Sequence, residues 1–128
     1  MRTRPLPLAV LALLSVVALA GGRGTSLEEE LRFGVEAARN GLWREAIFRW
    51  EKYLGKRPDD ARVRNNLAVA YESLGQFDKA RREYEEALRL EPDRKEIRRN
   101  YESFEELRAL LRARAGARAE AKGDERRP

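Results

Sequence analysis

The chain has 128 residues, of which 38% are charged and 42% hydrophobic, with a formal net charge of +5. This length and balance are typical of one all-α domain with heavily charged outer surfaces. The chain has no cysteine and no histidine, which excludes disulfides, thiolate metal sites and the usual catalytic base near neutral pH.

The first twenty residues have the pattern of a signal peptide. Arg2 and Arg4 precede an apolar run from Leu8 to Ala20, which ends in the small-residue pattern of a cleavage site. As a helix this run would be about 20 Å long, against about 30 Å for the core of a bilayer. We therefore expect residues 1–20 to be removed and the protein to be periplasmic or secreted. The alternative is an uncleaved anchor, residues 6–20, that holds the protein at the cytoplasmic membrane.

After a linker at residues 21–26, the sequence predicts a helical hairpin over residues 27–58. Ser26 and Glu29 form a capping box, which predicts that the first helix begins at about Leu27. Asn40-Gly41 suits a left-handed helix end, and the second helix then opens near Leu42. Apolar residues fall on one side of each helix at helical spacing, so the two helices should pack against each other.

A second hairpin follows over residues 59–92. Asp59-Asp60 supplies the N-cap of its first helix, and Gly75 ends that helix. Ala68 and Ala80 are small where the two helices would cross, as Gly34 and Ala46 are in the first hairpin, so the helix backbones should approach closely.

The two hairpins repeat with a period of 34 residues. Seven positions agree in residue type between them: Phe33 with Leu67, Gly34 with Ala68, Gly41 with Gly75, Trp43 with Phe77, Ala46 with Ala80, Trp50 with Tyr84, and Pro58 with Pro92. This period and pattern resemble the tetratricopeptide repeat (TPR) family. The resemblance implies an α-α solenoid of two TPR hairpins, with the aromatic residues in its core. The first hairpin departs from the family pattern at two positions: Ala37 stands where a tyrosine is usual, and Tyr53 stands where an alanine is usual. The large and the small side chain have thus changed places.

A stacked array needs a last helix with a polar outer face, and residues 93–114 predict such a capping helix. Asp93 and Glu96 would cap it, Ile97 and Phe104 lie on its apolar stripe, and Arg108 should face solvent. The remaining residues, 115–128, contain mainly alanine, glycine and charged side chains, and predict a disordered basic tail.

The sequence offers no catalytic constellation, so we expect a protein that is not an enzyme. No glycine-rich phosphate loop and no nucleophile motif occurs, and adjacent acidic residues on a helix point in different directions. No cofactor and no metal ion is expected. Removing Arg2 and Arg4 leaves 25 basic against 22 acidic residues, a small excess that gives little reason to expect nucleic acid as a partner.

The resemblance to TPR proteins implies a concave groove, lined by the first helix of each repeat, that takes a peptide or a helix of a partner protein. The matched positions place ten residues in it: Leu31, Val35, Arg39, Arg62, Asn65, Asn66, Val69, Glu72, Glu96 and Arg99. The leading hypothesis is a small exported adaptor. The alternatives are a homo-oligomer that stacks end to end through the apolar flank at Leu27–Leu31, and binding of the basic tail to an anionic envelope surface.

Overall fold

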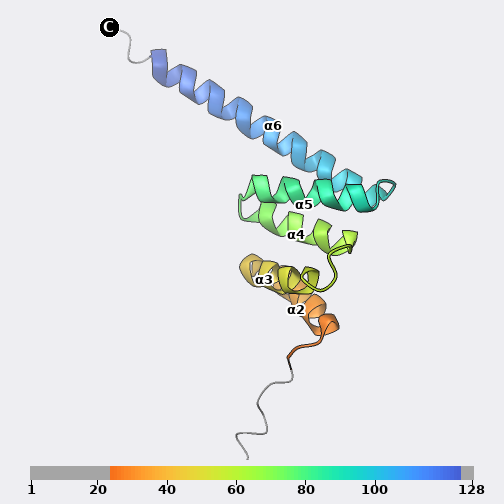
Figure 1. Ribbon diagram of the computed structural model, residues 1–128. Coiled ribbons are helices and arrows are strands. Elements are labelled where there is room, and N and C mark those ends of the chain that lie inside the picture. Colours follow the sequence, from red (N-terminus) through yellow and green to blue (C-terminus); the bar gives the residue numbers. More distant parts are fainter. Residues whose placement is uncertain (1–23, 125–128) are drawn as a thin grey trace, which may run out of the picture.

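A computed structural model of the protein describes residues 24–124 (Figure 1), and every regular element in this part is an α-helix. The helices, with the labels of Figure 1, are α2 (Leu27–Arg39), α3 (Trp43–Leu54), α4 (Ala61–Ser73), α5 (Phe77–Leu90) and α6 (Lys95–Asp124). The all-α prediction is confirmed. The predicted signal peptide, residues 1–20, lies outside the described residues. None of the helices from α2 to α6 combines the length and the apolar character needed to cross a membrane.

Helices α2 and α3 form one antiparallel hairpin, and α4 and α5 form the next. Each hairpin turns at a glycine with positive φ, 72° at Gly41 and 71° at Gly75, where an L side chain would be strained. The N-caps predicted for α2 and α4 are present. Ser26 and Glu29 make both hydrogen bonds of a capping box, and the Asp60 side chain accepts from the backbone N–H groups of the first turn of α4.

Small residues allow the paired helices to approach closely, as predicted. Ala46, Ala68 and Ala80 have no exposed surface at all. In the first hairpin Gly34 of α2 lies directly against the indole of Trp50 on α3. A Cβ atom added at Gly34 would lie 2.6 Å from Cδ1 of Trp50, and closer still to its Nε1. Close packing in this hairpin therefore depends on one glycine facing one tryptophan.

The hairpins and α6 stack in chain order, as Figure 1 shows. Helix α3 packs against α4, where the Tyr71 hydroxyl donates a hydrogen bond to Glu51. Helix α6 packs against α5 through an aromatic cluster, in which the rings of Tyr84 and Phe104 lie 5.2 Å apart and Tyr101 packs on both. Tyr84 and Phe104 are completely buried, so α6 closes the core of the second hairpin.

The capping helix differs from the prediction in three ways. It begins at Lys95, so Asp93 lies before the N-cap position, fully exposed and 3.9 Å from the guanidinium of Arg98. Arg108, expected in solvent, is only 9% exposed, because its guanidinium lies over the Phe104 ring and pairs with Glu105. Long basic side chains often cover apolar surface in this way.

The third difference concerns the predicted disordered tail. Helix α6 continues ten residues beyond Arg114, to Asp124, and residues 109–123 are all exposed. In Figure 1 this part of α6 extends away from the other helices. The prediction of disorder was therefore wrong for residues 115–124. The reason is that alanine, arginine, glutamate and lysine favour a helix even where no core is present to pack against.

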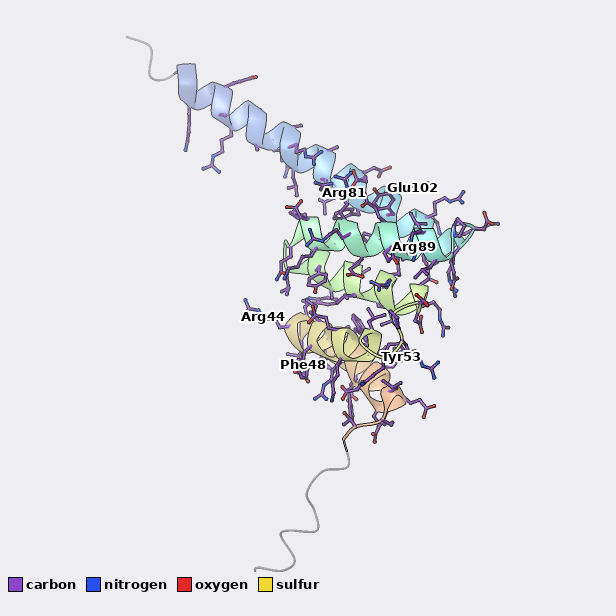
Figure 2. The ribbon with its side chains drawn as sticks, viewed as in Figure 1. Arg44, Phe48, Tyr53, Arg81, Arg89 and Glu102 are labelled. Carbon is purple, nitrogen blue, oxygen red and sulfur yellow. The ribbon has the colours of Figure 1, made fainter. Side chains whose placement is uncertain are left out.

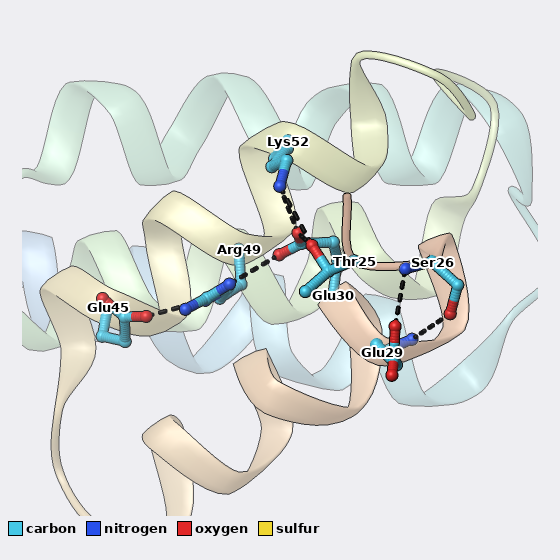
Figure 3. Close-up of polar contacts among 7 residues, drawn as sticks. All are labelled: Thr25, Ser26, Glu29, Glu30, Glu45, Arg49 and Lys52. Carbon is cyan, nitrogen blue, oxygen red and sulfur yellow. Dashed lines mark hydrogen bonds and ion pairs between the residues drawn. The ribbon is translucent and has the colours of Figure 1, made fainter. Parts of the chain in front are cut away.

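The first hairpin contains a buried carboxylate with its ion-pair partners. Glu30 of α2 is 1% exposed, and its carboxylate accepts from Thr25, Lys52 and Arg49 (Figure 3). The guanidinium of Arg49 also lies 5.4 Å from the centre of the Phe33 ring. The first hairpin therefore contains an ion-paired cluster around Glu30 that the sequence analysis did not predict.

Candidate partner-binding groove

The first helices of the two hairpins and the capping helix share one cavity of about 340 Å3. Leu31 and Val35 come from α2, and Val63 and Ile97 from the first turns of α4 and α6. Val63 and Ile97 are almost completely buried, and Leu31 and Val35 are half-buried. These four side chains give the cavity an apolar floor. They come together because the 34-residue period brings equivalent helix turns to the same side of the stack.

Polar side chains surround this floor. Arg62, Asn65 and Asn66 of α4 line the cavity beside Arg94 and Glu96. Asn65 is 3% exposed, and its Oδ1 accepts a hydrogen bond of 3.1 Å from Nδ2 of Asn100 on α6. This bond satisfies part of the buried amide and ties α4 to α6 across the floor of the cavity.

The charged groups at the cavity differ in whether they are already paired. Arg94 forms an ion pair with Glu91, and this hydrogen bond raises the pKa of Arg94. Arg62 and Glu96 have no ion pair with any side chain in residues 24–124. Within residues 24–124, Arg62 and Glu96 are thus the lining charges without an ion-pair partner, beside amide groups and an apolar floor. Such a surface can bind an amphipathic ligand.

Six of the ten predicted groove residues line this cavity: Leu31, Val35, Arg62, Asn65, Asn66 and Glu96. The other four lie elsewhere. Val69 packs against the hydrophobic core, and the Glu72 carboxylate accepts a 2.9 Å hydrogen bond from the buried Tyr84 hydroxyl. Arg39 and Arg99 are exposed residues outside the lining.

Three lining residues were missed by the sequence analysis: Val63, Arg94 and Ile97. Val63 and Ile97 share one position of the 34-residue period, and apolar residues at this spacing predict helix packing and not a place in a groove. Arg94 precedes the first turn of α6, in a connection to which the repeat pattern assigns no groove position. Among residues 24–124, no group of three acidic, histidine or cysteine side chains is placed to hold a metal ion.

Comparisons with known proteins agree with the helical-repeat fold. A family model of the tetratricopeptide repeat matches residues 61–94. Among solved structures, the chain is similar to the MamA D159K mutant, with 22% sequence identity and a TM-score of 0.58 over 93% of this chain. The chain spans 64% of the length of that MamA chain. The hairpin of α4 and α5 is thus a tetratricopeptide repeat, and residues 24–124 have the fold of a TPR-type helical solenoid.

Proposed function

We propose that the protein is a non-catalytic adaptor that binds a peptide or a helix of another protein in the groove between α2, α4 and α6. The observation that carries this proposal is the cavity of about 340 Å3, to which all three helices contribute and which has an apolar floor with a polar surround. A solenoid of this type offers an extended concave surface for contacts. The absence of histidine and cysteine from the sequence supports a role without catalysis.

The proposal includes export. Its support is the order of basic, apolar and small residues in the first twenty positions, which matches a signal peptide. Expression of the full chain in a bacterium, followed by fractionation and N-terminal mass analysis, tests this point. We expect a periplasmic protein whose chain begins at Gly21. A product that retains Met1 and sediments with membranes would favour the uncleaved anchor instead.

Site-specific crosslinking tests the groove. A photoreactive amino acid at Asn66 should trap one dominant partner in the exported protein, because Asn66 lines the cavity. The control is the same probe at Arg82, an exposed position on α5 outside the cavity lining. If both positions give the same set of crosslinked products, the groove has no specific partner and the proposal fails.

Two alternatives have weaker support. End-to-end stacking was expected to use the flank at Leu27–Leu31, yet Leu31 lines the cavity and Leu27 is half-buried. Binding of an anionic envelope surface has the basic side chains of the exposed end of α6 in its favour, among them Arg114, Arg118 and Lys122. The acidic Glu120 on the same helix offsets part of this charge.

A further inference from the structure

The end of the chain differs in charge from the two hairpins. From Ala109 to Pro128 the sequence has six basic residues and three acidic ones. Residues 21–128 contain 25 basic and 22 acidic residues, which leaves 19 of each for residues 21–108. The hairpins and the first part of α6 are therefore neutral overall, and the last twenty residues carry the whole excess of positive charge.

Most of this basic end is an exposed helix. Residues 109–123 of α6 are all exposed, and in Figure 1 this part of α6 extends away from the hairpins. A helix rises 1.5 Å per residue, so this segment is about 22 Å long. No ion pair within residues 24–124 neutralises its four basic side chains, Arg112, Arg114, Arg118 and Lys122.

Apolar side chains are exposed where this segment leaves the second hairpin. Among residues 24–124, five large apolar side chains are exposed, and three of them are Leu107, Leu110 and Leu111 of α6. Leu110 is 52% exposed, and Leu107 and Leu111 are 36% and 38% exposed. Three leucines within five positions of one helix thus form an apolar patch that the described part of the chain leaves partly uncovered.

Helical spacing puts basic side chains on the same side of α6 as the leucines. Residues three or four positions apart lie on one side of a helix, whereas residues two positions apart lie on nearly opposite sides. Arg114 follows Leu110 by four positions, and Arg118 and Lys122 continue this spacing. Glu120 is two positions from both Arg118 and Lys122, so it lies on the other side. The leucine side of residues 109–123 is therefore basic without an acidic residue.

We propose that this side of α6 binds the surface of a phospholipid bilayer that contains anionic lipids. Guanidinium and ammonium groups pair with the phosphates of the headgroups, and the leucines enter the boundary between headgroups and acyl chains. A bilayer surface offers both kinds of contact to one side of one helix, while Glu120 on the other side stays in water. This inference goes beyond the proposed function, because it gives the adaptor an attachment that does not use the groove.

Co-flotation with lipid vesicles tests the charge. The full chain, recovered after export and weighed by mass spectrometry, is mixed with vesicles of phosphatidylcholine alone or with added phosphatidylglycerol. The variant is Arg114→Glu/Arg118→Glu. The matched control, Arg44→Glu/Arg82→Glu, makes the same change of charge at exposed residues of α3 and α5. Circular dichroism confirms that each protein is folded.

We expect the wild-type chain to bind the vesicles with phosphatidylglycerol more tightly than those without it. The affinity should fall about tenfold or more in Arg114→Glu/Arg118→Glu, and less than about twofold in the control. Added salt should weaken the binding, because the charges are exposed.

A second pair of variants tests the leucines. Leu110→Ala should lower the affinity for the same vesicles about threefold or more, because the leucine side chain would no longer enter the boundary of the bilayer. Leu42→Ala is the control, since Leu42 is a leucine of similar exposure, 59%, beside α3, and its replacement should leave the affinity unchanged.

A fluorescent probe tests which side of α6 meets the lipid. The chain has no cysteine, so an environment-sensitive dye can be attached at Leu110→Cys or, as the control, at Ala109→Cys. Ala109 is two positions from both Leu107 and Leu111 and thus lies on the other side. We expect vesicles with phosphatidylglycerol to shift the emission to shorter wavelength at position 110 but not at position 109.

Three results would overturn the proposal. The first is equal binding to both kinds of vesicle, and the second is an equal effect of the two charge-reversed pairs. In either case any attachment comes from elsewhere in the chain, such as residues 1–20 where the mass shows that they are retained. The third is an absence of vesicle binding together with binding of soluble polyglutamate that Arg114→Glu/Arg118→Glu abolishes, which would assign this end of α6 to an acidic protein.

Loss of binding in Arg114→Glu/Arg118→Glu without any effect of Leu110→Ala would show that charge alone holds the helix at the surface, and the insertion of leucines would be wrong. None of these outcomes bears on the groove, which the crosslinking at Asn66 tests separately.

Discussion

At the scale of single residues, two buried contacts hold the first hairpin together. Trp50 is 3% exposed and fits against Gly34, and the buried carboxylate of Glu30 is surrounded by donors from α3 and from Thr25. The sequence pattern predicted the buried indole, because aromatic residues at this spacing form the core of a repeat. It did not predict the buried carboxylate, because an acid in the first turn of a helix is normally exposed.

Replacement of Gly34 by alanine should destabilise the protein. The added Cβ would overlap the rigid indole of Trp50, and overpacking of this kind costs about 1–3 kcal/mol, more than the gain of up to about 1 kcal/mol in helix propensity. Gly116→Ala is the control, since its added Cβ would meet no side chain and no other helix within 4 Å apart from its immediate chain neighbours, and this change should be neutral or stabilising. Urea unfolding measures both. A Gly34→Ala variant as stable as the wild type would contradict the close approach.

Replacement of Glu30 by glutamine should lower stability at pH 7 and matter less in acid. The hydrogen bond from Lys52, followed by that from Arg49, lowers the pKa of Glu30 in the folded protein. Because the pKa of Glu30 is lower in the folded protein, its carboxylate contributes its full stabilisation of the fold at pH values above its unfolded-state pKa of about 4.3. This contribution is lost as the pH falls through the folded-state pKa.

The measurement is the free energy of unfolding of the wild type and of Glu30→Gln between pH 7 and pH 3. The difference between the two should be constant above about pH 5 and should shrink below about pH 4. Glu45→Gln is the control, because it removes an exposed partner of the same Arg49 and should have a small effect. A difference that stays the same down to pH 3 would argue against an ionised, stabilising Glu30.

At the scale of the elements, helix boundaries followed local chemistry where a cap or a glycine defines them. Gly41 and Gly75 end α2 and α4, and Ser26 and Asp60 cap their starts, as the sequence predicted. Helix α6 was predicted less well at both ends. Its start is at Lys95, and its C-terminal part contains no glycine in a left-handed conformation, so nothing stops the helix at Arg114.

Replacement of Asp60 by alanine should destabilise α4. Its side chain caps two backbone N–H groups and accepts from the Tyr53 hydroxyl, and loss of an N-cap costs about 0.5–2 kcal/mol. Asp60→Asn retains an acceptor oxygen and should recover most of the stability. Thermal and urea unfolding compare the three proteins. Equal stability of the alanine and asparagine variants would show that the cap contributes nothing.

Truncation after Arg114 should leave the stability of the hairpins unchanged. Residues 115–123 are exposed, whereas the contacts of α6 with α5 are made by Tyr101, Phe104 and Arg108. The helical signal in circular dichroism should fall in proportion to the about ten helical residues that are removed, while the unfolding temperature stays the same. A marked drop in that temperature would show that the end of α6 supports the stack.

At the scale of the whole molecule, two hairpins and one capping helix make a stack whose two ends are covered differently. Helix α6 covers the second hairpin with aromatic rings. At the other end, Arg32 and Arg49 lie over the ring of Phe33. Charged groups over the terminal ring reduce the apolar surface that a second copy would need for end-to-end stacking.

We therefore expect the protein to be a monomer. Sedimentation velocity of the full chain between about 1 and 100 µM should give one species with the mass of a single chain, because Arg32 and Arg49 lie over the Phe33 ring at one end and α6 packs on the second hairpin at the other. A sedimentation coefficient that rises with concentration would contradict this expectation and would restore the stacking alternative.

The sequence alone determined the all-α class, the 34-residue period, the turns and the buried small and aromatic positions. Each of these depends on local conformation or on spacing along one chain. Only the tertiary structure determined which of the charged and polar residues come into contact with one another. Only the stacking of α2, α4 and α6 brings Arg62, Arg94 and Ile97 to one cavity, and only the approach of α3 buries Glu30. The reason is physical: spacing fixes the face of a helix on which a side chain lies, whereas its burial and its partners depend on the neighbouring helix.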